Sequence, residues 1–561
     1  MSTTPSAPVT ASTTTVFVAR KILTMNPAQP TATHVAVRDG RILAVGDADT
    51  MAAWGPYALD TRFADKVLMP GLVEGHSHAM EGGLWQFPYV GFHDRRSPDG
   101  KLWRGLDTFA AVVARLVEAE AEMTRQGVPA ETPLLAWGFD PIFFGDARIT
   151  VNELDRVSLT RPIVITHASM HLMNVNTATL RAAEIDRHTD IEGIARFADG
   201  EPNGELQEFA AMFPVNRLIG NLFRKVGMSE LGLRMFAQSA LLAGVTTATD
   251  LVNELADDSI EMMQRVCAED AYPLRLVPAF RPGEAVVGEA GVARVRAAIA
   301  ASHDKLHAGM VKLVVDGSIQ GFTARLRWPG YFNGAPNGIW VLSPRTVHEA
   351  VLAFHRAGFQ LHIHTNGDEA TEVALDAVEA ALAAHPRPDH RHTLQHCQMA
   401  DEAQFQRMAR LGMCVNLFAN HIYYWGDAHL NLTMGPDRAH RMDACGTAAR
   451  LGVPFAIHSD APITPLAPLF TAWCAVNRRT AAGVVLGEAE RITVPQALHA
   501  ITMGAAFTLK LDHEIGSIAV RKRADFCVLE ADPLGVPASE LKDIGVWGTV
   551  VGGRVFAAPR A

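Results

Sequence analysis

Short apolar runs alternate with helix-period segments through most of this chain, and this alternation limits its possible folds more than any other feature. Residues 372–384 show the helical pattern, with apolar side chains at Val373, Leu375, Val378 and Leu382. An alternation of strands and helices predicts a parallel sheet with crossover helices, and eight such units predict an α/β fold of the (β/α)8 barrel type. The predicted barrel strands are residues 67–78, 245–250, 274–280, 311–317, 360–367, 392–397, 414–420 and 454–460.

Both ends of the chain have strand patterns of a different kind. Residues 34–45 form two alternating runs around an Asp-Gly turn, and residues 550–556 form two runs around Gly-Gly. Two β-rich ends around a long middle predict one small β-sandwich built from residues 16–68 and 515–561. The alternative is a pair of unrelated terminal additions. The barrel is expected over residues 69–514.

The distance between the first and second barrel strands is too long for a single crossover. We therefore expect an α/β insertion over residues 85–235, with strand-like runs at 134–139 and 163–167. Residues 1–15 are rich in Ser, Thr and Pro. They lack the basic and apolar regions of a signal peptide, so they are predicted to form a flexible tail.

Charge and cysteine content argue against several classes of function. A formal net charge of −10 over 561 residues argues against a nucleic-acid-binding protein. The six cysteines are scattered without a C-x-x-C pair, which indicates a reduced, cytoplasmic chain. No apolar run is long enough to cross a bilayer. We expect neither nucleic acid nor membrane as a partner, and the sequence leaves open whether the chain forms a homodimer.

Metal-compatible side chains stand at the ends of five predicted strands. His76 and His78 are two positions apart, so both side chains point to the same face of a strand. The other candidates are Lys312 in the fourth strand, His362 and His364 in the fifth, His396 in the sixth and Asp460 at the end of the eighth. A single strand-end histidine is usually structural, but side chains from five strands meeting at one end of a barrel indicate a metal site. Imidazole and carboxylate ligands suit zinc or a related divalent ion.

Taken in order, these segments resemble the amidohydrolase superfamily, and most of all the family-3 amidohydrolases that include N-substituted formamide deformylases. The resemblance rests on residues 70–78, 311–317, 364–368, 396, 458–462, 516–518 and 522–526. The chain departs from the family at Arg521, where relatives usually have glycine, and at Asn366, where many relatives have an apolar residue. The second departure lies beside His364 and bears on the pocket there.

The resemblance implies a distorted barrel, a β-sandwich from both termini and a centre of two divalent ions, with one ion as the alternative. By the resemblance, the first ion is held by His76, His78 and Asp460, the second by His364 and His396, and the bridge between them is Lys312 as a carbamate formed with carbon dioxide. Two cations close together need a bridging anion, whereas an ammonium group would repel them. A salt bridge from Lys312 to a buried acid in a one-metal site is the alternative, and Asp316 on the same strand face is the alternative anion. His362 is expected to be structural.

The reaction implied is metal-dependent hydrolysis of a non-peptide carbon–nitrogen bond, in particular that of a linear amide. Asp460 is expected to take the proton of a metal-activated water and to pass it to the leaving nitrogen. A mononuclear deaminase of the same superfamily is the alternative enzyme. It is disfavoured because Gly367 stands three residues after His364, where deaminases have a glutamate. A non-catalytic scaffold is disfavoured because the ligand set is complete.

The substrate is predicted to be a small-molecule amide with an apolar or aromatic group. Tyr423, Tyr424 and Trp425 follow the seventh strand, where a loop overhangs the barrel mouth. These residues line a substrate pocket or pack against the insertion. His171, in a segment similar to family sequences, is predicted to hold the substrate carbonyl. Arg438 is expected to meet an anionic substrate group or to form a structural ion pair.

Overall fold

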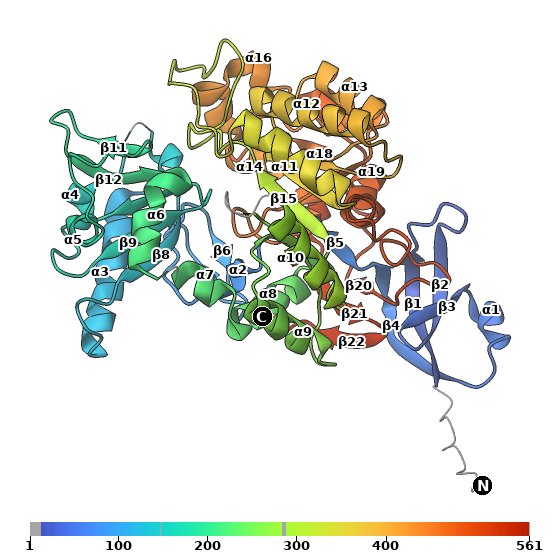
Figure 1. The fold of residues 1–561 in the computed structure, drawn as a ribbon. Helices are drawn as coiled ribbons and strands as arrows, with labels where there is room; N and C mark the ends of the chain where they lie inside the picture. The colour runs from blue at the N-terminus through green and yellow to red at the C-terminus, as the bar shows by residue number, and fades with distance from the viewer. Residues whose placement is uncertain (1–12, 146, 221, 283–287, 560–561) are drawn as a thin grey trace, which may run out of the picture.

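The chain forms a barrel, with an insertion on one side and a terminal sheet on the other (Figure 1). The computed structural model describes residues 13–145, 147–220, 222–282 and 288–559. Of the predicted flexible tail, residues 1–12 lie outside the described residues. Strand β1 begins at Thr14, two residues before the predicted start. None of the described helices combines the length and the apolar character needed to cross a membrane.

The predicted barrel is confirmed. Its eight strands are all parallel and stand in chain order around the sheet. They are β5 (Leu72–Glu74), β13 (Val245–Asn253), β14 (Arg275–Phe280), β15 (Met310–Val314), β16 (Gln360–Thr365), β17 (Thr393–His396), β18 (Cys414–Leu417) and β19 (Phe455–Ile457). The first and last strands meet just beyond their C-terminal ends, where Ser77 pairs with Ala461 and the His78 N–H donates to the Ala461 carbonyl at 2.8 Å.

The first predicted barrel strand, 67–78, is divided between two sheets. Residues up to Pro70 belong to β4 (Tyr57–Pro70), whose end pairs with β20 (Phe526–Leu529) of the terminal sheet. Gly71 then passes close to β13, since a Cβ atom there would lie 1.9 Å from Thr246 Oγ1. The division follows from pairing with a strand more than four hundred residues away, which the local pattern does not contain.

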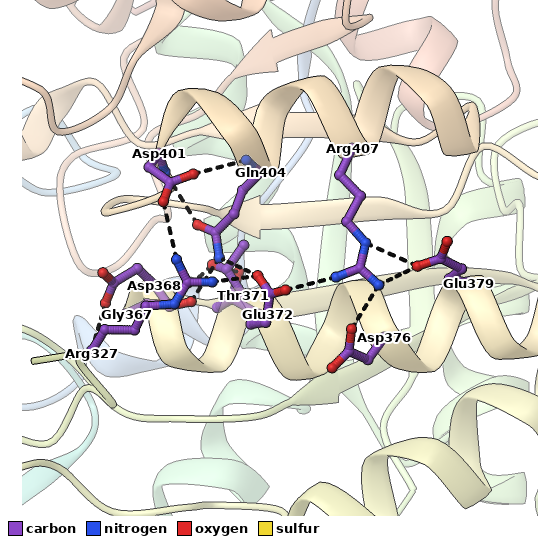
Figure 2. A network of polar contacts seen from close by, with 11 residues as sticks. Arg327, Gly367, Asp368, Thr371, Glu372, Asp376, Glu379, Asp401, Gln404 and Arg407 are labelled. Carbon is purple, nitrogen blue, oxygen red and sulfur yellow. Dashed lines mark hydrogen bonds and ion pairs between the residues drawn. The ribbon is translucent and has the colours of Figure 1, made fainter.

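Helices follow the barrel strands and pack against their outer faces. The helical pattern predicted at 372–384 lies in α12 (Asp368–Ala384), which buries Leu375 and Val378 against the core. Figure 2 shows how α12 is tied to α13 (Glu402–Leu411): Arg407 forms ion pairs with Glu372, Asp376 and Glu379. Arg327, in the loop after β15, pairs with Glu372 and Asp401, so the same network also anchors that loop.

Both chain ends contribute to one sheet, as predicted. Its strands follow one another in the order β22, β21, β20, β4, β1, β2 and β3. The further strands are β1 (Thr14–Leu23), β2 (Thr31–Arg38), β3 (Arg41–Gly46), β21 (Val546–Val551) and β22 (Arg554–Ala557). The sheet is continuous and folds over one apolar core, which includes Phe17, Phe63 and Phe526. The edge strand β3 approaches the segment before β20, where Arg41 pairs with Arg523 and the Ala524 N–H donates to the Gly40 carbonyl at 2.9 Å.

The predicted insertion between β5 and β13 contains a second sheet with its own apolar core. The strand order is β11, β12, β10, β9, β8, and the two predicted strand-like runs are β8 (Leu134–Phe139) and β9 (Ile163–His167). The others are β10 (Leu172–Val175), β11 (Ile194–Arg196) and β12 (Pro202–Gln207). A buried hydrogen bond of 2.8 Å from Trp425 Nε1 to Asp140 joins the insertion to the barrel loop after β18.

Candidate metal centre

Buried imidazoles and one carboxylate gather where the first and last barrel strands meet. His76 and His78 follow β5, and Asp460 follows β19. The Asp460 Oδ1 atom lies 3.1 Å from His78 Nε2 and 3.3 Å from His76 Nε2. The ligand atoms of these three residues all lie within 4.8 Å of one another, so they can hold one metal ion. The sequence predicted this group.

The backbone is strained at Asp460 and at a neighbouring histidine, His396. His396, at the end of β17, has φ +65°, and Asp460 has φ +54°. Residues other than glycine rarely adopt this left-handed conformation, and it persists where the surrounding structure imposes it, often at functional sites. It turns both side chains into the barrel mouth, where His396 Nδ1 lies 3.6 Å from Asp460 Oδ2.

The ring of His76 is oriented by an amide. Its Nδ1–H donates to Gln395 Oε1 at 2.6 Å, and Gln395 Nε2 donates to His362 Nδ1 at 2.6 Å. This arrangement leaves the lone pair of His76 Nε2 directed at the Asp460 side, as metal-binding histidines require. His362 lies behind this pair, where burial lowers its pKa to about 3.

Lys312 is buried and points at the same group, with its Nζ 3.2 Å from His76 Nε2. Burial lowers the pKa of Lys312 to about 7, although Asp460 opposes the shift. A neutral amine, the form that reacts with carbon dioxide, is therefore accessible near neutral pH. Asp316, the alternative anion, accepts backbone hydrogen bonds from Arg325, Asn366 and Gly367 at 2.9–3.0 Å. Its oxygens are thus already engaged in holding the loops.

His364 stands beside His396, with 4.5 Å between the ring centroids. Its Nε2 lies 3.3 Å from the Gly317 carbonyl oxygen and 3.3 Å from Asn366 Nδ2. In the described chain, two groups of three possible ligands bring all their ligand atoms within 4.8 Å, and His364 belongs to neither. The structure therefore places His364 beside His396, its expected partner in the second ion site. His364 does not converge with His76, His78 and Asp460, the expected ligands of the first ion.

Comparison with known proteins identifies this arrangement. The family model described as "Amidohydrolase family" matches residues 64–557, from β4 into β22. The chain belongs to the amidohydrolase family. It is accordingly a hydrolase of carbon–nitrogen bonds, as predicted.

Individual relatives match nearly the whole chain. The N-substituted formamide deformylase of Arthrobacter pascens is 26% identical over 95% of this chain and 96% of its own length. The putative amidohydrolase YtcJ of Bacillus subtilis is 27% identical over 93% of this chain and 95% of its own length. The crystal structure of an uncharacterized metal-dependent hydrolase from Pyrococcus horikoshii has a TM-score of 0.70 at 19% identity, covering 94% of this chain and 99% of that one.

This amidohydrolase has one candidate ligand that the sequence analysis missed. His458 belongs, with His76 and His396, to the second group of converging ligand atoms. It is fully buried, and neither of its ring nitrogens has a hydrogen-bond partner among the residues that the structure describes. The signal was available, because His458 stands two positions before Asp460, on the same side of the strand. Unpaired buried imidazole nitrogens fit a divalent ion better than a closed core.

Glu74 is a second residue that the sequence did not predict. Its buried carboxyl group accepts hydrogen bonds from the His76 N–H at 3.2 Å and from Ser459 Oγ at 2.7 Å. Burial raises the pKa of Glu74 to about 8. Glu74 therefore connects the segment after β5, which carries His76, to the segment after β19, which carries Asp460.

The insertion contributes His171 to the cavity at the metal centre. Its ring centroid lies 5.5 Å from that of His364, and its Nδ1–H donates to Glu208 Oε2 at 2.8 Å. Burial opposes a charged imidazole, yet nearby carboxylates, Glu208 foremost, raise the pKa of His171. Glu208 and Met170 both have φ near +60° (+62° and +61°). The backbone on both sides of this contact is held in a strained conformation that fixes the ring.

The aromatic residues divide between two places. Tyr424, at the end of α14 (Asn420–Tyr424), and Trp425 line a second cavity together with Phe143 of the insertion. Ile463 borders both this cavity and the one at the metal centre. Tyr423 packs instead against Phe470 and Trp473. Phe470 and Trp473 lie on the barrel helix α18 (Pro468–Asn477), whereas Tyr424 and Trp425 contact His93 and Phe143 of the insertion. The substrate pocket stays a prediction.

Arg438 lies apart from the metal centre. In α16 (Gly435–Ala439) it borders a surface groove, and its guanidinium donates to the carbonyl oxygens of Gly330 and Met434. These contacts are made to backbone carbonyls and not to a carboxylate. Its meeting with an anionic substrate group stays a prediction.

Proposed function

We propose that this amidohydrolase cleaves a linear, non-peptide amide whose nitrogen carries an apolar or aromatic substituent, with zinc as its divalent metal. The observation that carries the proposal is the Asp460 carboxylate in contact with two imidazoles at the barrel mouth. The ions would be held by His76, His78 and Asp460, and by His364 and His396, with Lys312 as a carbamate between them. A divalent ion supplies Lewis-acid chemistry and lowers the pKa of its water toward neutrality.

Two side chains then have separate roles, one in proton transfer and one in binding the substrate. Asp460 takes the proton of the attacking water and passes it to the leaving nitrogen, since its carboxylate borders the cavity at the centre of the imidazoles. His171 holds the substrate carbonyl through Nε2, because its Nδ1 is occupied by Glu208.

The second cavity supports an aromatic substituent. Its free volume is about 30 Å³, and it is walled by Tyr89, Phe92, Phe143, Tyr424 and Trp425. It adjoins the metal-centre cavity at Ile463, so an amide at the metal centre can extend its nitrogen substituent past this residue. The name of the Arthrobacter pascens relative, an N-substituted formamide deformylase, agrees with a substituent on nitrogen.

The test is hydrolysis of N-benzylformamide by the purified chain, followed as formate release. Activity should disappear with a chelator and return with zinc. The His78→Asn variant should bind less zinc and lose activity. Zinc-dependent release of ammonia from cyclic amidines, with no turnover of any linear amide, would instead assign the deaminase alternative.

A further inference from the structure

Three polar side chains border the metal-centre cavity and have no part in the mechanism above. Ser318 and Gln320 belong to the loop after β15, and Asn366 follows β16. All three are at least nine-tenths buried, with exposed fractions of 4%, 3% and 5%. Their Oγ, Oε1 and Oδ1 atoms have no hydrogen-bond partner within the part of the chain that the structure describes. Buried polar atoms are nearly always paired, so this cluster indicates a ligand.

The orientation of Asn366 is determined by its other contacts. Its Nδ2 donates to the Gly317 carbonyl at 2.8 Å, and its backbone N–H donates to Asp316 at 3.0 Å. Since a carbonyl oxygen can only accept, the nitrogen end of the amide must face Gly317. The oxygen end is the unpaired one, and its residue borders the cavity.

The loop that carries Ser318 and Gln320 is held rigidly. Thr323 Oγ1 accepts from the Ser318 N–H at 2.9 Å, and the Thr323 N–H donates to the Ser318 carbonyl at 3.0 Å. Gly317 has no room for a side chain, because a Cβ atom would lie 2.1 Å from Thr323 Oγ1 and 2.3 Å from Glu208 Oε1. The unpaired atoms therefore stand on a fixed frame, as a binding subsite requires.

The substrate proposed above has a matching donor. In a secondary amide the carbonyl is held by His171 and the metal centre, which leaves one N–H group without a partner. We infer that Asn366 accepts a hydrogen bond from this N–H, with Gln320 and Ser318 beside it, and that the enzyme selects secondary amides over tertiary ones. The inference rests on the proposed function.

The test compares N-benzylformamide with N-benzyl-N-methylformamide, which lacks the donor. A site built to bond an N–H strongly rejects an analogue without one, because its buried acceptor is left unpaired. We expect kcat/KM to favour the secondary amide by between about 10²- and 10⁴-fold. In Asn366→Leu this ratio should fall toward one, with the zinc content unchanged. The matched control is Asn420→Leu, since Asn420 also has a buried, unpaired Oδ1 but does not border the cavity.

Binding separates this inference from the proposed function. Calorimetry of both amides with Asp460→Asn, after its zinc content has been determined, reports affinity while turnover is slow. A binding preference for the secondary amide together with no hydrolysis by the wild-type chain would remove the proposed function and keep the subsite. Equal affinity and equal kcat/KM for the two amides would overturn the subsite and keep the function. A ratio that falls equally in Asn420→Leu, or zinc loss in Asn366→Leu, would also overturn it.

Discussion

The barrel and the insertion build opposite sides of one site by different means. The barrel places its ligands through strand register: His76 and His78, like His458 and Asp460, stand two positions apart beyond the ends of the two strands that meet. The insertion places His171 through a loop, held by a contact to Glu208 across two strained backbone positions. The comparison indicates that the barrel fixes its side chains where parallel strands end and the insertion fixes His171 through a side-chain contact, with left-handed backbone conformations in both regions.

The largest effect is expected at Lys312, on the barrel side. Lys312→Ala removes the proposed carbamate bridge, so we expect loss of one of the two proposed ions and loss of activity. Zinc analysis and formate release measure this, and short carboxylic acids should restore part of the activity. Full zinc content with normal turnover would show that no carbamate is needed.

Asp460→Asn comes next, since it keeps the shape but removes the proton acceptor. Loss of a general base typically lowers kcat by about 10²–10⁴-fold. The measurement is kcat at saturating substrate, with zinc content determined in parallel. Near-normal kcat in a fully metallated variant would assign the proton transfer to another residue.

The next largest effect is expected at the aromatic cavity between the insertion and the barrel loop after β18. Tyr424→Ala should lower kcat/KM for N-benzylformamide by about 10–200-fold, because an apolar contact set is lost. N-methylformamide should be affected far less. Tyr423→Ala is the matched control, since Tyr423 packs against Phe470 and Trp473. Equal losses in both variants would contradict the substituent pocket.

Glu208→Gln tests whether the insertion orients His171. Outer partners of this kind typically contribute about 10–100-fold. We expect a loss in that range carried mainly by kcat, because the carbonyl is held less well in the transition state. Glu205→Gln is the control: Glu205 is a buried carboxylate on β12 that contacts Arg148 at 3.4 Å, away from the cavity. If the two variants behave alike, Glu208 is structural.

The smallest effect concerns the joint between the two regions. Burial raises the pKa of Asp140 from 3.8 to about 6. The folded state therefore keeps a proton that the unfolded chain has released, so this stability is present below pH 4 and is lost as pH rises to about 6. The loss is about 3 kcal/mol. The fall in Tm between pH 4 and 7 should be smaller in Asp140→Asn, and parallel curves for the two proteins would contradict this.

The sequence predicted the ligands because a barrel brings the ends of distant strands together, which makes short motifs informative in three dimensions. His458 also stands near the end of a barrel strand, so the same reasoning could have predicted it. Glu208 and Gln395 were not, since their partners lie 37 and 319 positions away and the contacts depend on side-chain packing. The carbonyl contacts of Arg438 could not be predicted for a related reason: nothing in a local pattern distinguishes a substrate-binding arginine from one that donates to backbone carbonyls.

The place where the barrel closes has a consequence of its own. The two outermost strands meet through Ser77 and Ala461, and the ligands His78 and Asp460 flank this junction. An ion held by His78 and Asp460 would therefore cross-link the first and last strands of the barrel sheet. Loading with metal should then suppress hydrogen exchange most strongly in the segments after β5 and β19, far more than in β14, which carries none of the proposed ligands. At the proposed site, binding of the metal would thus also stabilise the closure of the barrel.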